Sequence, residues 1–188
     1  MTIDLRELSP DAWPDLERLF GQRGACGGCW CMSWRCPDGE RWEELKGEGA
    51  RERQRVLVEA GRSHGVLAYA HGQPVAWVAF GPRLDFPKLG RARTLACDDA
   101  ERVWSVPCFF ITKEHRGQGL SKRLLAAAVA SIRARGGDVI EGYPVRVKPG
   151  SRSPAAFVWT GLPSTFAALG FVQVGDPNAS KLRMRLVG

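Results

Sequence analysis

The feature that most constrains the fold is a strand, a tight glycine turn and a helix in direct succession. Residues 103–112 are predicted to form a long strand, and Arg116-Gly117-Gln118-Gly119-Leu120-Ser121 follows as the turn. A helix is then predicted from about Gly119 to Arg135 and is ended by Gly136-Gly137. Its apolar face consists of Leu120, Leu124, Leu125, Ala128 and Ile132. After this helical crossover, residues 138–143 are expected to return as a strand parallel to the first.

The glycine turn is a candidate anion site. Gly117 and Gly119 leave the backbone open to close approach, and the first helical turn offers unpaired N–H donors and the positive end of the helix dipole. Arg116 and Lys122 add positive charge beside it. The turn therefore predicts a pyrophosphate site, with a plain tight turn as the alternative.

Two common phosphate motifs do not fit this turn. A P-loop needs Gly, Lys and then Ser or Thr, but here Lys122 follows Ser121 and no glycine directly precedes the lysine. A dinucleotide fingerprint needs a third small residue where the helix packs on the strand, and that position is again Lys122.

The remaining elements predict one α/β (α+β) domain with a mixed sheet over residues 1–188. Residues 2–22 suit a strand and then a helix that opens near Ser9-Pro10, and residues 40–61 suit one or two exposed helices. Residues 66–70 and 75–80 form a hairpin, and 81–100 are expected to be a long surface loop. A short helix at 163–169 precedes strands at 171–174 and 181–187. The order is a β-meander, then β-α-β, then α-β-β.

Composition narrows the class of partner. The chain has 188 residues, 44% of them hydrophobic and 25% charged, as in ordinary globular proteins, and carries a formal net charge of +7. Its basic residues are scattered from Arg6 to Arg185 without interleaved aromatics, so we expect no nucleic-acid partner. No apolar run could span a bilayer and Met1 to Phe20 is too charged for a signal peptide, so we expect a cytoplasmic protein without a membrane partner.

Four cysteines lie close together at Cys26, Cys29, Cys31 and Cys36. The favoured interpretation is that they pack with neighbouring Trp and Met side chains in the core or in a substrate wall. Zinc binding is an alternative that the cramped Cys29-x-Cys31 spacing disfavours, and a reversible disulfide is another. We assign no metal ligand.

The segment from Phe109 to Ser121 resembles the core motif of the GNAT family of N-acetyltransferases, a strand followed by Arg-x-x-Gly-x-Gly/Ala. Ser121 stands where the family usually has glycine or alanine. A second segment, Phe166-Ala-Ala-Leu-Gly170-Phe171, is similar to the family's closing helix and its transition into the last strands. The resemblance covers about residues 66–187, and the Cys-x-x-Cys-Trp-Cys-Met run from Cys26 is similar to openings in a bacterial subgroup of the family.

The resemblance implies a GNAT-like domain with central parallel strands that splay apart, and acetyl-CoA or another acyl-CoA as co-substrate. Phe109, Phe110 and Ile111 would line the pantetheine arm. The pyrophosphate would lie at Arg116, Gly117, Gln118, Gly119, Leu120, Ser121 and Lys122. Residues 1–61 would shape the acceptor side, residues 66–187 would form the core, and the acceptor would be a small-molecule amine. A homodimer is compatible with this picture.

Two departures from the family pattern concern proton transfer. Phe166 replaces a tyrosine that protonates the leaving thiolate in many relatives, and Pro107 replaces a glutamate near the pantetheine. The polar residues that we take as catalytic candidates instead are Glu141, Tyr143 and Ser164. The departures leave open a catalytically weak acyl-CoA-binding or sensor protein. The cysteine cluster leaves open a second alternative, a metal- or thiol-dependent binding module built on Cys26 to Cys36.

Overall fold

The computed structural model describes residues 2–146 and 159–188, which share one seven-stranded mixed sheet. The strand order is β1-β2-β3-β4-β5-β7-β6, with β1 at Ile3–Glu7, β2 at His64–Ala70, β3 at Gln73–Pro82, β4 at Val103–Ile111, β5 at Val139–Gly142, β6 at Val172–Val174 and β7 at Arg183–Val187. Only β4 and β5 pair in parallel, and every other neighbouring pair is antiparallel. The predicted mixed α/β fold, with a meander, a β-α-β unit and an α-β-β end, is confirmed.

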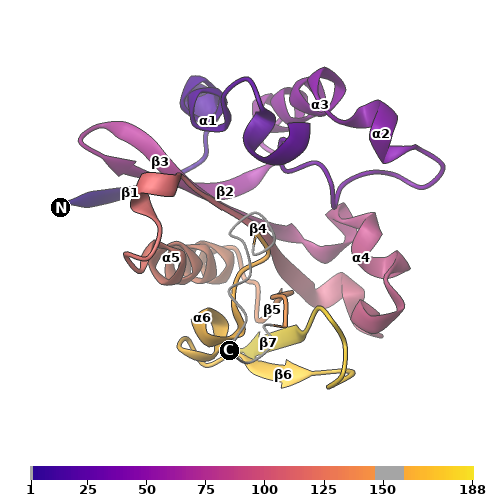
Figure 1. Ribbon diagram of the computed structural model, residues 1–188. Helices are drawn as coiled ribbons and strands as arrows, with labels where there is room; N and C mark the ends of the chain where they lie inside the picture. The colour runs from indigo at the N-terminus through magenta and orange to yellow at the C-terminus, as the bar shows by residue number, and fades with distance from the viewer. Residues whose placement is uncertain (1, 147–158) are drawn as a thin grey trace.

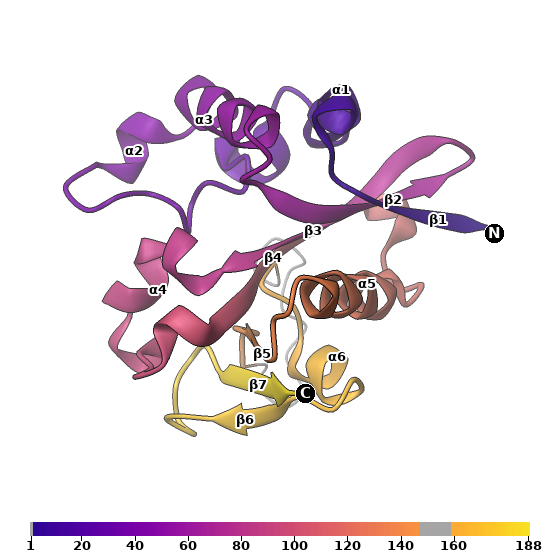
Figure 2. The same cartoon turned by 180° about the vertical axis from the view of Figure 1, so that it is seen from behind.

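Helices cover both faces of the sheet (Figure 1). The helices α1 (Trp13–Phe20), α2 (Trp42–Leu45) and α3 (Glu48–Glu59) lie on one face, and α5 (Leu120–Ala134) and α6 (Pro163–Ala167) lie on the other. The view from behind shows the same two layers (Figure 2). The sheet therefore separates the N-terminal segment from the helix that follows the glycine turn.

Successive side chains of β3 contribute to two hydrophobic cores, one on each face of the sheet. Trp77 and Ala79 pack with the N-terminal helices, whereas Val78 and Phe80 pack with the α5 side. Successive side chains of a strand point to opposite faces, so a strand covered on both sides is apolar throughout. This pattern places β3 in the middle of the molecule.

The segment 81–100 is not the surface loop that we predicted. It forms the short helices Arg83–Asp85, α4 (Pro87–Arg91) and Arg93–Leu95, with a further turn at Ala100–Arg102. Phe86, Leu89 and Leu95 are at most 1% exposed and form a third core with Trp34 and Tyr143. The turns are too short to produce a helical repeat in the sequence, and prolines and glycines hide them further.

The parallel ladder between β4 and β5 covers only part of β4. Val103 to Val106 pair with Val139 to Gly142, and the remainder of β4 pairs with β3 alone among the described residues. Just there the register with β3 shifts, so that Val106 and Pro107 together oppose Phe80. The central strands part at this bulge, as the splayed geometry requires.

Gly142 and Phe166 test how tightly the α6 side is packed. A Cβ on Gly142 would lie 1.9 Å from Cε1 of the buried Phe166 ring, so Gly142→Ala is expected to lower the free energy of unfolding by about 1–3 kcal/mol through overpacking. Gly49→Ala is the control, because its Cβ would meet Leu45 at an ordinary 3.7 Å inside α3 and should stabilise by up to about 1 kcal/mol. Urea unfolding measures both, and equal effects would contradict the packing argument.

Candidate active site

Two cavities meet over the part of β4 that has left β5. The first, which we name the glycine-turn cavity, measures about 230 Å³ and is lined by Cys26, Phe109, Phe110, Ile111, Arg116, Gly117, Ser121, Trp159, Gly161, Leu162 and Thr165. The second, the cysteine-loop cavity, measures about 280 Å³ and is lined by Ala25, Cys26, Gly27, Cys29, Cys31, Ser33, Trp34, Trp42, Lys46, Cys108, Phe109, Phe110 and Trp159. Four residues belong to both: Cys26, Phe109, Phe110 and Trp159.

The glycine turn exposes main-chain donors at the start of α5. Gly117 and Gly119 have φ values of 74° and 76°, a left-handed conformation that favours glycine. Among the described residues, no hydrogen bond uses the N–H groups of residues 117–121. A Cβ at either glycine would meet no atom within 4 Å, so the space beside the turn is open. Unpaired donors, open space and the positive end of a 15-residue helix suit a bound anion.

The predicted cofactor-binding residues divide into two groups. Phe109, Phe110, Ile111, Arg116, Gly117 and Ser121 line the glycine-turn cavity. Gln118, Gly119, Leu120 and Lys122 do not line it: the amide group of Gln118 donates to the carbonyl of Glu114 at 3.0 Å, and Leu120 is buried against the core. The turn can present the main chain of these last residues, so their role as cofactor contacts stays a prediction.

A segment that the sequence did not single out lies along the open edge of β4. The N–H of Phe109 donates to the carbonyl of Trp159 at 2.6 Å, and Trp159, Gly161, Leu162 and Thr165 line the glycine-turn cavity. The position of Trp159 close before the predicted closing helix was the only signal in the sequence. This segment takes one backbone donor that a bound pantetheine would otherwise meet.

The cysteine loop is held in an unusual backbone conformation. Ala25, Trp30 and Cys31 have φ values of 66°, 43° and 57°, which non-glycine residues rarely adopt. A Cβ on Gly24 would lie 2.3 Å from Nε1 of Trp30, so this glycine lets the indole close over the loop. The result is that Trp30 and Cys31 enter the core, while Cys26 and Cys29 face the cavity.

Cys31 and Cys108 form a buried pair of thiols on the cavity floor. Their Sγ atoms lie 3.4 Å apart, and the indole N–H of Trp77 donates to the Cys31 sulfur at 3.2 Å. The contact with Cys31 and burial raise the pKa of Cys108 well above that of a free thiol. The interpretation of the cysteines as a cavity wall fits this geometry, and the described residues contain no group of three or more metal-ligating side chains.

Glu141 and Tyr143 lie in a buried network of charged groups. Both side chains are fully buried, and Arg83, only 4% exposed, donates to Glu141 at 3.2 Å and to the Tyr143 hydroxyl at 2.7 Å. Arg185 contacts the other Glu141 oxygen at 2.8 Å, and Ser105 bonds the Tyr143 hydroxyl at 2.7 Å. Burial and then the Glu141 charge raise the pKa of Tyr143. Neither residue lines the two cavities, so the geometry favours a structural role over proton transfer.

Ser164 is exposed on the first turn of α6, and the residue of that turn that lines the glycine-turn cavity is Thr165.

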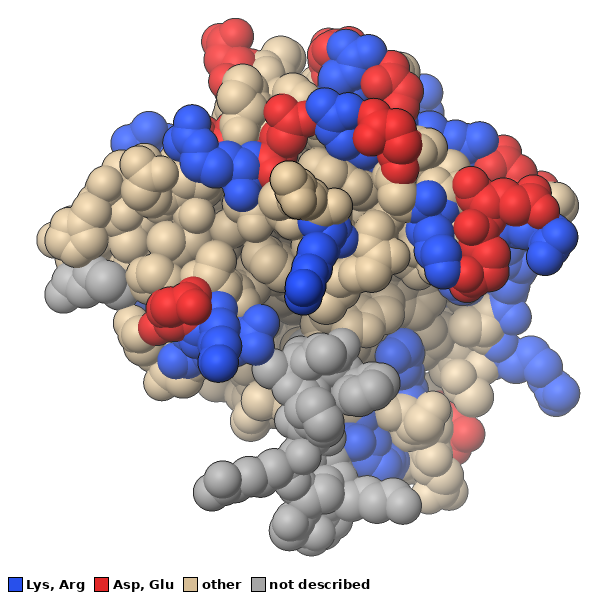
Figure 3. Space-filling model, turned by 45° about the horizontal axis from the view of Figure 1, so that its top comes forward, with Lys and Arg blue, Asp and Glu red and all other residues tan. Residues whose placement is uncertain are grey.

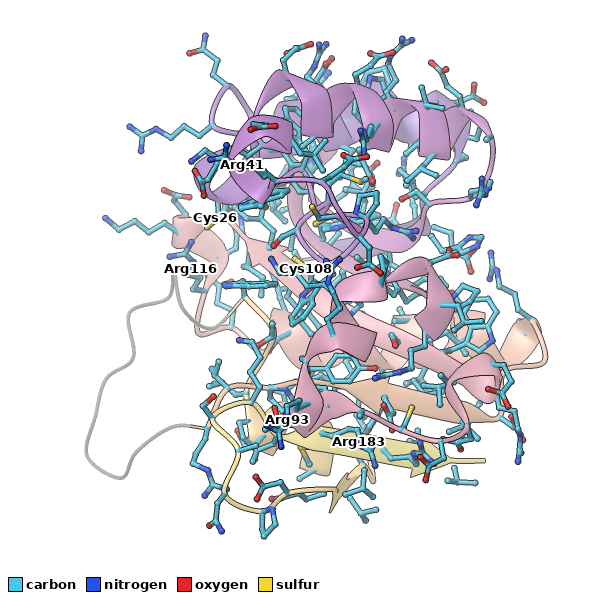
Figure 4. The ribbon with its side chains drawn as sticks, turned by 90° about the vertical axis from the view of Figure 1, so that its right-hand side faces the viewer. Cys26, Arg41, Arg93, Cys108, Arg116 and Arg183 are labelled. Carbon is cyan, nitrogen blue, oxygen red and sulfur yellow. The ribbon has the colours of Figure 1, made fainter. Side chains whose placement is uncertain are left out.

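Cys26 and Arg116 approach the same cavity from opposite layers, the first from the N-terminal loop and the second from the glycine turn (Figure 4). Arg93 and Arg183 lie well away from this pair, toward β6 and β7 (Figure 4). Sequence reasoning therefore located the glycine turn and missed the segment that begins at Trp159.

Replacement of Glu141 separates a structural role from a catalytic one. Glu141→Gln leaves the buried Arg83 without its ionic partner, so the free energy of unfolding should fall by about 3–5 kcal/mol. The exposed Glu101 serves as control, and Glu101→Gln should change stability by less than about 0.5 kcal/mol. Urea unfolding measures both. An unchanged stability for Glu141→Gln, combined with loss of a titrating limb in the pH profile of kcat, would instead identify a proton-transfer group.

Cys29 provides a test of the cavity's polarity. Burial raises the pKa of its thiol from 9.0 to about 11, so at pH 8 the reactive thiolate should be about 100-fold scarcer than for a free cysteine. Iodoacetamide is therefore expected to label the exposed Cys26 long before Cys29. Peptide mass spectrometry over a time course reports the two rates, and labelling of Cys29 as fast as a free cysteine would contradict this environment.

Several solved structures have a fold similar to that of this chain. The solved structures that resemble it include the PaiA N-acetyltransferase from Thermoplasma acidophilum in complex with coenzyme A, with a TM-score of 0.56, 15% identity and 100% of each chain covered. The GNAT domain of PAT from S. lividans has a TM-score of 0.60 and 16% identity over 100% of this chain and 92% of that one. The ribosomal-protein-alanine N-acetyltransferase from Brucella melitensis has a TM-score of 0.57 and 17% identity over 98% of this chain and 99% of that one.

These likenesses establish the fold, and the sequence itself establishes the family. A search of curated proteins gives no match. The model of the acetyltransferase (GNAT) family matches residues 29–143, which is more than half of the chain and includes β4, the glycine turn and β5. Membership of this family is the basis for the N-acetyltransferase activity and for acyl-CoA as the acyl donor. The chain belongs to the GNAT family of acetyltransferases.

Proposed function

We propose that this protein transfers an acetyl group from acetyl-CoA directly to the amine of a small molecule. The observation that carries the proposal is the junction of the two cavities: the one beside the glycine turn and the one beside the cysteine loop share Phe109 and Phe110. An acyl donor and an acceptor can therefore approach each other over the same two residues. Placing two reactants in contact is the main catalytic requirement of a direct transfer.

The residues present fit an acyl-CoA. The unpaired N–H groups of residues 117–121 would donate to the pyrophosphate, with Arg116 supplying positive charge beside them. Phe109 to Ile111 would line the pantetheine along the edge that β4 exposes after Val106. When bound, acetyl-CoA supplies the thioester carbonyl that the amine attacks.

The size of the acceptor side supports a small acceptor. The cysteine-loop cavity, at about 280 Å³, is close to the lower end of the range for small-molecule sites, about 300–1,000 Å³. Acidic and basic side chains alternate on the face that the N-terminal helices form, and they form no continuous patch of one sign there (Figure 3). Ion pairs such as Arg55 with Glu52 and Glu59 account for this mixture on α3. That face offers no field suited to a highly charged polymer.

A catalytically weak acyl-CoA-binding protein is the second candidate. The observation that favours it is chemical: among the described residues, no carboxylate or imidazole lines either cavity.

A third hypothesis, a metal-dependent module at the cysteine loop, has less support. The described ranges 2–146 and 159–188 contain no group of three or more His, Cys, Asp or Glu side chains that could hold a metal ion. No helix within those ranges has the length and apolar character needed to cross a membrane. Sustained release of free thiol that depends on an added amine would reject the weak-binding candidate.

Acetyl-CoA binding is tested by charge reversal at the turn. Saturating acetyl-CoA, about 100 times Kd, should stabilise the protein by about 2.7 kcal/mol and raise Tm by several degrees. Arg116→Glu should weaken binding by at least about tenfold, because it reverses a charge on the glycine-turn cavity. Arg133→Glu makes the same charge change in the last turn of α5, at the other end of the helix from the glycine turn. This variant should retain the full rise in Tm on addition of acetyl-CoA. Loss of the shift in both variants, or in neither, would contradict the assignment.

A further inference from the structure

Aromatic side chains form part of the wall of the cysteine-loop cavity, beside its cysteines. Trp34, Trp42 and Trp159 line it together with Phe109 and Phe110. The rings of Trp34 and Trp159 lie 5.7 Å apart between centroids, at 48° to each other. Flat aromatic ligands gain dispersion and edge-to-face contacts from such walls, and a cavity of about 280 Å³ holds about one substituted ring.

The charges around this cavity are positive. Lys46 is the only charged side chain among its described lining residues, and Glu43, its ion-pair partner, is not one of them. Lys88 lies 5.8 Å from the ring centroid of Trp42, and Lys181 lies 5.3 Å from that of Trp159. An aromatic ring attracts an ammonium group, but these two rings already interact with lysines. A cationic acceptor would therefore meet these lysines and, among the described lining residues, no carboxylate.

Among the described lining residues, no carboxylate or imidazole is available to remove a proton from an acceptor. Burial raises the pKa of Cys29 to about 11. The hydrogen bond with Cys31 and burial raise the pKa of Cys108 well above that of a free thiol, so both thiols stay protonated. Glu141 is buried and engaged by Arg83 and Arg185. An alkylamine reaches an enzyme mainly as its ammonium ion and must lose a proton before it can attack. An aromatic amine delocalises its lone pair into the ring and is uncharged at neutral pH.

We infer that the acceptor is an aromatic amine whose nitrogen is uncharged at neutral pH, seated between the indole walls of the cysteine-loop cavity. The inference rests on the proposed acetyl transfer. The nitrogen lone pair forms the N–C bond to the thioester carbonyl while the C–S bond breaks, and the proton that the nitrogen loses passes to the departing thiolate or to solvent. No protein base is needed before the attack, which matches a lining without carboxylate or imidazole among the described residues. Lys46 on the cavity wall, with Lys88 and Lys181 beside the rings of Trp42 and Trp159, favours an acidic substituent on the acceptor ring.

A matched pair of substrates tests the inference. Para-aminobenzoate and para-(aminomethyl)benzoate share the ring and the carboxylate, and differ by one methylene that makes the second amine a cation at neutral pH. With acetyl-CoA, kcat/KM at about pH 7 should be at least about tenfold higher for para-aminobenzoate. Its kcat/KM should stay nearly constant from about pH 6 to 9, whereas that of the aminomethyl compound should rise with pH as the ammonium ion deprotonates.

Trp42 and Trp13 provide matched variants. Both indoles are half-buried in the N-terminal segment, but Trp42 lines the cavity and Trp13 packs against Trp30 outside it. Trp42→Ala should raise KM for para-aminobenzoate about tenfold, because one stacking wall is removed, and should leave the Tm shift by acetyl-CoA unchanged. Trp13→Ala should leave KM unchanged.

The outcomes separate the inference from the function on which it rests. If acetyl-CoA raises Tm but the aminomethyl compound is the better substrate at about pH 7, the acceptor inference is wrong and acetyl transfer stands. If acetyl-CoA binds and neither compound is acetylated, the inference is also wrong. If acetyl-CoA does not bind at all, both the inference and the proposed function are overturned. An equal rise of KM in the two tryptophan variants would contradict the position of the ring.

Discussion

The site depends on the separation of two hydrogen-bonded strands. β4 pairs with β5 only as far as Val106, and the next residue is Pro107, which has no N–H to continue a ladder. The bulge opposite Phe80 turns β4 away at the same point, and the indole N–H of Trp34 donates to the Pro107 carbonyl at 3.2 Å. Both cavities depend on this break, because it exposes one edge of β4 between them.

The proline thus has a structural role at a position where the family resemblance leads us to expect a glutamate. A carboxylate at this position would stand near the acyl donor, and its loss removes a base from the site. The remaining acid, Glu141, is enclosed by arginines and stabilises the segment 83–102 against the ends of the central strands. The Glu141 carboxylate forms an ion pair with Arg83 instead of standing free to transfer a proton. Without this carboxylate the positive charge of Arg83 would be buried with no negative partner.

The cysteine loop supplies thiols and an indole to the layer of the N-terminal helices. Its left-handed residues place Trp30 in the core, where it meets Phe20 edge-on at 5.6 Å between ring centroids. The same bends present Cys26 and Cys29 to the cavity. Thiols and indoles make a wall of low polarity, and a wall of this kind would favour an uncharged ligand over a cation.

Local patterns were enough to identify β4, the glycine turn and α5, since these residues are adjacent in the chain and each obeys its own periodicity. Phe109, Phe110 and Ile111 line a cavity, and their predicted contact with the pantetheine came from the family resemblance and stays a prediction. The short helices of 83–95 could not be predicted, because each is too short to show a helical repeat. The contact of Cys31 with Cys108 and the enclosure of Glu141 could not be predicted either, because each joins residues far apart in sequence. The sequence by itself determined that a strand-turn-helix unit would present backbone donors. Only the tertiary structure decided which side chains line the cysteine-loop cavity, since that depends on how the N-terminal loop packs across β4.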